Sequence, residues 1–261
     1  MAFMTQDVYI NMELIFLVTL RMVGFFVSAP FFSGQYVNNY IKVGLSFVLA
    51  NVVVATGLIK SVSYSNGIFG YFVLGIKEVA MGLFLGYIAT IVLNIIVMVG
   101  EMIDFQIGFT MASVMDPLSG EQMPITGNLY HFVIISIMLI TNMHHELIKT
   151  IIYSYNIVGL GGFNLTQAVF DIHMEILTDV FITAIKLASP IIGIMLIINA
   201  GLGVLVRTLP QMNMFVVGLP IKIYVSLYVM ILITPAMIMN FSYIFDKINV
   251  GLIKILKGMI P

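Results

Sequence analysis

Long apolar runs without a single charge limit the folds open to this chain more than any other feature. Three of these runs are as long as the roughly 20 residues that an α-helix needs to cross the hydrocarbon core of a membrane: 79–100, 187–206 and 223–245. Three further apolar segments are shorter or carry polar residues: 14–34, 43–59 and 124–143. No segment shows the alternation of a membrane β-strand. The sequence therefore predicts an all-α integral membrane protein with six helices.

The composition supports this class and excludes several functions. Hydrophobic residues make up 61 % of the chain and charged residues 9 %, against about 45–50 % and 25 % in soluble domains. The net charge is −1, with no basic run that could follow phosphates, so nucleic acid is not an expected partner. The "HHELI" run lacks the second histidine of a zinc protease because Lys149 occupies that position. With no cysteine and no nucleophile motif, we expect neither an enzyme nor a bound cofactor or metal.

Small residues and prolines inside the apolar runs predict bent and broken helices that pack on protein. Gly82 and Gly86 form a pair with small-xxx-small spacing, which lets two helix backbones approach closely. Pro190 and Pro235 fall inside predicted helices, where each removes a backbone hydrogen bond.

Charged residues in or beside the apolar runs are candidates for assembly contacts. An ionisable side chain in a membrane is costly, so it is a functional candidate by default. The charges expected to pair with partner chains or with one another are Arg21, Glu101, Asp104, Arg207 and Lys222. The alternative is that some of them end helices at the lipid headgroups.

The stretch "GFTMASVMDPLSGEQMPITG" at residues 108–127 interrupts the apolar runs with glycines, prolines and methionines. Asp116-Pro117 favours a turn, and Pro124 suits the first turn of a new helix. Methionine side chains adapt to irregular partners, so the stretch is predicted to be a looping element with a deformable apolar surface, such as a plug. The alternative is a connector that packs on itself.

Residues 154–179 differ in character from the rest of the chain and predict a division. "GLGGFN" is interpreted as a flexible link, and Asn164 with Gln167 as the start of a helix. Asp171, Glu175 and Asp179 then share one helical face, which requires water or a basic partner.

Three motifs give the chain a resemblance to a known family. The runs "GEMIDFQIGFTMASVMDPLSGEQMP" (100–124), "GLGVLVRTLPQMNMFVVGLPIKI" (201–223) and "RMVGFFVSAPFFS" (21–33) resemble the FliR family of flagellar and type III secretion export-apparatus proteins. The likeness covers nearly the whole chain. Some relatives carry phenylalanine where this chain has Met111 and Val114.

The resemblance implies a single copy within a hetero-oligomeric export gate in the bacterial inner membrane, at the flagellar basal body. Its partners would be FliP-like and FliQ-like subunits, FlhB-like and FlhA-like proteins, membrane lipid and unfolded export substrates. Residues 1–170 would resemble a FliP subunit and residues 171–261 a FliQ hairpin. A plug loop near residues 105–124 would close the channel with Phe109, Met111, Val114, Met115, Asp116, Pro117 and Leu118.

Two other classes remain as alternatives. A multi-pass secondary transporter would also combine broken helices with intramembrane charges, but it should show an inverted repeat, and none is evident in the sequence. A membrane enzyme would need the ligand or nucleophile sets that the sequence lacks.

Overall fold

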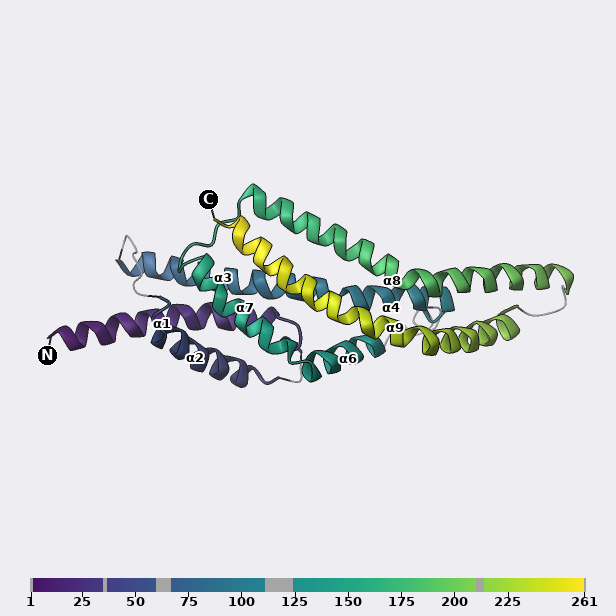
Figure 1. Ribbon diagram of the computed structural model, residues 1–261, viewed down its shortest axis with the longest axis horizontal. Coiled ribbons are helices and arrows are strands. Elements are labelled where there is room, and N and C mark those ends of the chain that lie inside the picture. Colours follow the sequence, from purple (N-terminus) through teal and green to yellow (C-terminus); the bar gives the residue numbers. More distant parts are fainter. Residues whose placement is uncertain (1, 35–36, 60–66, 111–123, 210–213, 261) are drawn as a thin grey trace. The chain divides into compact units, whose positions relative to one another are not determined.

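The computed structural model describes residues 2–34, 37–59, 67–110, 124–209 and 214–260 (Figure 1). Within these ranges the regular secondary structure is α-helix throughout, which confirms the all-α prediction. The helices are α1 (Ala2–Ser28), α2 (Asn39–Ala55), α3 (Gly67–Leu93), α4 (Ile95–Ile107), α6 (Ile125–Ile140), α7 (Met143–Ile157), α8 (Gln167–Thr208) and α9 (Met214–Gly258).

Three helical stretches in the described part of the chain are long and apolar enough to cross a membrane. They are Gly67–Ile107, Gln167–Thr208 and Val216–Gly258, and a fourth results if α6 and α7 count as one broken span. Of the other predicted apolar segments, 43–59 falls mostly in α2, whose 17 residues are fewer than the roughly 20 that a crossing needs. The predicted number of six membrane helices stays a prediction.

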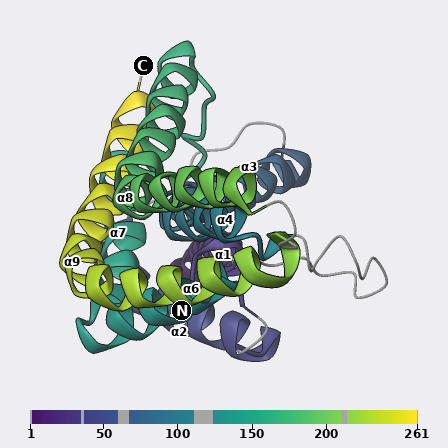
Figure 2. The same ribbon diagram turned by 90° about the vertical axis from the view of Figure 1, so that its right-hand side faces the viewer.

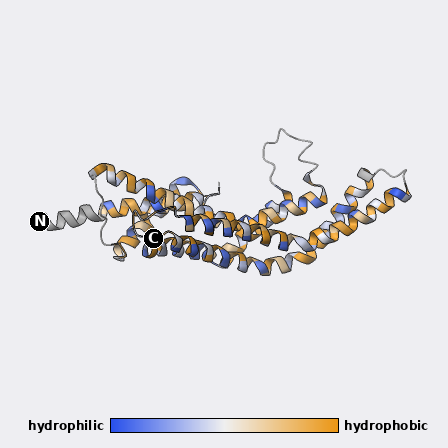
Figure 3. Cartoon of the chain, turned by 90° about the horizontal axis from the view of Figure 1, so that it is seen from above, coloured by the Kyte–Doolittle hydropathy of each residue, from blue (hydrophilic) through white to orange (hydrophobic). Residues whose placement is uncertain are grey.

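The long helices carry the features of a membrane protein. Hydrophobic residues recur along the helices and hydrophilic ones are scattered among them (Figure 3). Phe72, Ile197 and Leu232 are examples of large apolar side chains that are exposed. Proline interrupts the hydrogen bonding of α8 at position 190, and that of α9 at positions 220 and 235, as predicted for 190 and 235.

The described chain divides into two compact units. The first comprises residues 1–92, 141–177 and 246–261, and the second comprises residues 93–140 and 178–245. The resemblance of residues 1–170 and 171–261 to two partner proteins stays a prediction.

In the first unit, α1 lies beside α2 (Figures 1 and 2) and also crosses α3 closely. The core includes Met22, Phe25 and Phe26 of α1 with Met81 and Leu85 of α3, all nearly inaccessible to solvent. Burial of such side chains contributes about 1.5–3 kcal/mol each relative to exposure, so this interface is a main source of stability for the unit.

The start of α8 in this unit differs from the prediction. Thr166, and not Asn164, caps the helix, because its hydroxyl accepts the Val169 N–H at 3.2 Å. The same hydroxyl donates to the Gly258 carbonyl at 2.8 Å, so it also ties the helix start to the end of α9. The Asn164 side chain is exposed.

In the second unit, α4 packs against α6. The hydroxyls of Tyr130 on α6 and Thr234 on α9 lie 3.4 Å apart, and the Asn199 amide on α8 donates to Gln106 on α4 at 3.5 Å. Polar side chains thus accompany apolar packing between the helices of this unit.

Candidate functional site

The connecting segment, residues 108–124, joins α4 to α6 and contains the expected plug residues. The structure describes its two ends: Phe109 is half-buried directly after α4, and Pro124 directly precedes α6. The other predicted plug residues lie outside the described residues, namely Met111, Val114, Met115, Asp116, Pro117 and Leu118.

The first end of the connecting segment is fixed by a glycine and a backbone carbonyl. Gly108 has φ 97°, a left-handed conformation that side chains disfavour, and it ends α4. The N–H groups of Gly108 and Phe109 both donate to the Asp104 carbonyl, at 3.0 and 3.1 Å. The glycine of the sequence motif is therefore the one that allows the chain to leave the helix.

The second end is held by the side chain of the same aspartate. One carboxylate oxygen of Asp104 accepts the Thr126 N–H at 3.0 Å, and the other accepts the Thr126 hydroxyl. Thr126 is the second residue of α6, whose first N–H groups have no partner inside the helix. A negative charge at a helix N-terminus is also favourable. Asp104 is 1 % and Thr126 3 % exposed, so the contact is buried.

Two glycines bring the helices together beside this contact. Gly100 on α4 lies directly against the backbone of Gly127 on α6, and a Cβ at Gly100 would collide with it. The two helices that flank the connecting segment therefore meet backbone to backbone.

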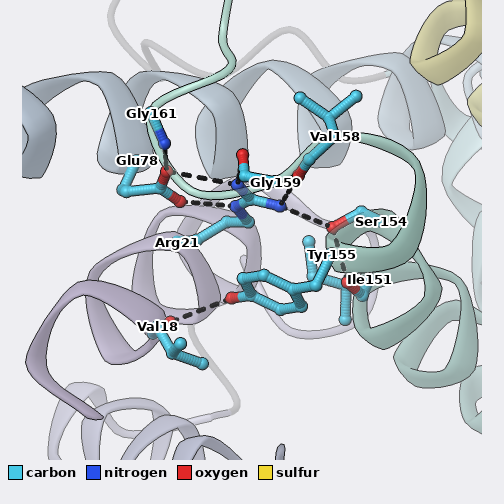
Figure 4. Close-up of polar contacts among 9 residues, drawn as sticks. All are labelled: Val18, Arg21, Glu78, Ile151, Ser154, Tyr155, Val158, Gly159 and Gly161. Carbon is cyan, nitrogen blue, oxygen red and sulfur yellow. Dashed lines mark hydrogen bonds and ion pairs between the residues drawn. The ribbon is translucent and has the colours of Figure 1, made fainter. Parts of the chain in front are cut away.

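A second polar site lies in the first unit and centres on Arg21 (Figure 4). Arg21 and Glu78 are both 0 % exposed, and Arg21 Nε lies 2.6 Å from Glu78 Oε2. Nη2 donates to Glu78 Oε1 at 3.1 Å, so the pair is bidentate. Such a pair offsets the desolvation of two buried charges only when further hydrogen bonds complete it.

The last turn of α7 and the segment after it supply those hydrogen bonds. Nη1 donates to the Ser154 hydroxyl and the Val158 carbonyl, both at 3.1 Å, and Nη2 donates to the Gly159 carbonyl at 3.2 Å. All five donors of the guanidinium are thereby used. The Gly161 N–H donates to Glu78 Oε1 at 2.7 Å (Figure 4).

Tyr155 closes the remaining side of the Arg21 site. Its ring centroid lies 4.2 Å from the guanidinium carbon, a cation–π contact, and its hydroxyl donates to the Val18 carbonyl at 3.1 Å. Every polar group of Arg21 and Glu78 is thus occupied by the chain itself. The site fixes α1, α3 and α7 relative to one another and is suited to a structural role.

This site corrects the interpretation of "GLGGFN" as a flexible link. Gly159 and Gly161 belong to that run, and both are hydrogen-bonded to the buried ion pair. Lys77 also donates to the Gly161 carbonyl, at 3.5 Å. Gly161 has φ 77°, a left-handed conformation that side chains disfavour, so a glycine is favoured at this position.

The remaining predicted charges are not brought together. Glu101 is exposed on α4, Arg207 is exposed in the last turn of α8, and Lys222 is half-buried in α9. Their role in assembly stays a prediction. Within the described residues, no three His, Asp or Glu side chains are grouped as metal ligands would be.

Gly82 and Gly86 lie where α1 crosses α3. A Cβ at Gly82 would collide with the Arg21 carbonyl oxygen and lie 2.8 Å from the Phe25 nitrogen. A Cβ at Gly86 would collide with the Ser28 hydroxyl and lie 2.8 Å from the Ala29 nitrogen. Gly24 on α1 meets the Val79 carbonyl in the same way, at 2.6 Å.

Sequence reasoning missed three participants, which carry no local signal: Ser154 and Tyr155 at the Arg21 site, and Thr126 beside Asp104. Glu78 is recognisable from the sequence as an acid next to an apolar run, as Arg21 is a base inside one. What the sequence did not indicate is that these two charges pair.

Comparison with known proteins identifies the family. Residues 12–248 match the family described as "Bacterial export proteins, family 1". The flagellar biosynthetic protein FliR of Bacillus subtilis (strain 168) is 33 % identical over 226 residues, which cover 85 % of this chain and 86 % of the relative. FliR of Escherichia coli (strain K12) is 25 % identical over 239 residues, 91 % of this chain and 90 % of the relative.

A relative with a different name also matches. The surface presentation of antigens protein SpaR of Shigella flexneri is 27 % identical over 227 residues, which cover 86 % of both chains. These matches extend over both compact units and the connecting segment between α4 and α6. The chain therefore belongs to the FliR family of flagellar and type III secretion export-apparatus proteins.

Proposed function

We propose that this chain is a subunit of a flagellar type III export gate and forms part of the channel through which unfolded flagellar proteins pass. The match of residues 12–248 to a family of bacterial export proteins carries this proposal. The three apolar stretches that could cross a membrane support a membrane location. We assign the gate to the inner membrane at the flagellar basal body.

The expected partners are FliP-like and FliQ-like subunits within the gate, and FlhB-like and FlhA-like proteins around it. The exposed apolar side chains of α3, α8 and α9 give these helices surface for such partners or for lipid. Residues 1–170 would take the place of one more FliP-like subunit, and residues 171–261 that of one more FliQ-like hairpin.

The connecting segment is proposed to be the plug of the channel. It is rich in methionine and glycine, and it starts from two helices whose ends are held together by Asp104 and by the glycine crossing. A channel wide enough for an unfolded chain would otherwise conduct ions, and an apolar constriction blocks them by excluding water. Methionine can repack around passengers of many shapes at little strain.

The test replaces Met111 and Met115 with glycine, or removes residues 111–118, in a gate co-expressed with its partners. We expect several-fold faster uptake of a small osmolyte into cells that carry the assembled gate but no export substrate. The matched control is Leu58→Gly with Ile59→Gly in the connection after α2, which should leave uptake unchanged. Unchanged uptake through an assembled gate that lacks residues 111–118 would show that the segment is only a connector.

A further inference from the structure

We infer that Asp104 is a positioning residue that fixes the base of the connecting segment and thereby holds the seal in register. This inference rests on the proposed function of the segment as a plug. Asp104 itself lies before the segment and is part of α4, so it acts through the backbone that it anchors.

Asp104 ends one helix and begins the next. Its backbone carbonyl accepts the N–H groups of Gly108 and Phe109, where the chain leaves α4. Its carboxylate accepts the N–H and the hydroxyl of Thr126, where the chain enters α6. Asp104 therefore holds both ends of the segment. It lies four residues before the segment begins, and its partner Thr126 lies two residues after the segment ends.

The geometry at position 104 requires a carboxylate and not an amide. It is buried, and its charge lies at the N-terminus of a 16-residue helix, where both oxygens meet donors of Thr126. A neutral amide would keep one acceptor and present an N–H₂ group to the Thr126 donors, which leaves polar groups unsatisfied in a buried place. Closely related side chains are therefore not equivalent here.

Because α4 and α6 already pack at Gly100 and Gly127, the Asp104–Thr126 contact can determine the position of α6 and does not only add stability. Gly100 and Gly127 set how closely α4 and α6 approach, and Asp104 sets where α6 begins along α4. Joined ends restrict the conformations open to the chain between them. Loss of the carboxylate should then shift the base of the segment while the glycine crossing keeps the helices packed.

The experiment compares Asp104→Asn, Thr126→Val and Thr126→Ser in the gate co-expressed with its partners. We expect Asp104→Asn to raise osmolyte uptake several-fold in the assembled gate, and Thr126→Val to raise it less, because the Thr126 N–H still donates. Thr126→Ser keeps both donors and should restore the wild-type rate. Asp246→Asn makes the same chemical change at an exposed position of α9 and should have no effect.

A second readout does not depend on leakage. The chain has no cysteine, so spin labels can be placed at Phe105 and Leu129, two exposed positions on α4 and α6. Asp104→Asn should shift or broaden their distance distribution in the assembled gate, whereas Thr126→Ser should not. This measurement also reports on gates in which leakage has another origin.

The outcomes separate the two proposals. If removal of residues 111–118 causes leakage but Asp104→Asn causes neither leakage nor a changed distance distribution, the role of Asp104 is overturned and the plug stands. If removal of the segment causes no leakage, the plug is overturned. A changed distance distribution would then show that Asp104 positions a connector and not a seal.

Discussion

Arg21 and Glu78 form an ion pair with a high desolvation cost, because both side chains are fully buried. Hydrogen bonds from a distant part of the chain offset this cost. They come from residues more than 75 positions away from both charges, namely Ser154, Val158, Gly159 and Gly161. The ion pair and the segment after α7 therefore depend on each other. Removing either side leaves buried polar groups without partners.

At this scale we predict that Arg21→Met destabilises the gate subunit by about 3–5 kcal/mol, the usual cost of breaking a buried pair. The double variant Arg21→Met with Glu78→Met should not recover this loss, because the Val158 carbonyl and the Gly161 N–H lose the partners that they have in the ion pair. The measurement is the thermal midpoint of the co-purified complex. Lys149→Met removes an exposed ion pair with Glu146 and should change little. Full recovery in the double variant would contradict the proposed dependence.

Glycine crossings organise the elements of both units. In the first unit α1 crosses α3 at Gly24, Gly82 and Gly86, and in the second α4 crosses α6 at Gly100 and Gly127. Glycine weakens a helix by about 1 kcal/mol relative to alanine, so its presence at a contact is explained by the close approach it permits. Both crossings lie next to a buried carboxylate, Glu78 in one unit and Asp104 in the other.

For these elements we predict that Gly82→Ala separates α1 from α3 and lowers both the yield and the thermal midpoint of the complex. The added Cβ would collide with the Arg21 carbonyl and the Phe25 nitrogen. Both are backbone atoms of α1, so they cannot change rotamer as a side chain can, and the helix itself must move. Gly44→Ala on α2 is the control, since its Cβ would meet nothing within 4 Å. It should be neutral or slightly stabilising. Equal effects of the two substitutions would show that the crossing tolerates a methyl group.

The whole molecule offers far more apolar surface than a free-standing protein can leave uncovered. Large side chains are exposed along α2, α3, α8 and α9, and two compact units share the long helices α8 and α9. Lipid can cover part of this surface, but helices that meet at glycine crossings are typical of protein assemblies. Membership of an export-apparatus family agrees with this interpretation.

At this scale we predict that the chain accumulates only together with its export-apparatus partners. Expressed alone it should be degraded or aggregate, because its exposed apolar faces remain without protein contacts. The measurement is the amount of chain in the membrane fraction with and without co-expressed FliP-like and FliQ-like proteins. A folded, monodisperse monomer purified in mild detergent without partners would contradict this prediction.

Several features could be predicted from residue type and local spacing. The helical class follows from charge-free runs of about 20 residues, and the prolines at 190 and 235 are recognisable inside them. The family is identifiable because its motifs are continuous in sequence, as in residues 100–124. Helix boundaries were less accessible: Asn164 was the predicted cap, but Thr166 also reaches the Gly258 carbonyl, a contact 92 positions away.

The sequence by itself determined that this chain is a helical membrane protein of the FliR family, because apolar length and contiguous motifs are local properties. Only the tertiary structure decided which polar groups meet. Arg21 lies 57 positions from Glu78 and 138 from Gly159, and Asp104 lies 22 from Thr126. Such pairs are selected by the cost of burying an unpaired charge or donor, and that cost arises only once the helices have packed.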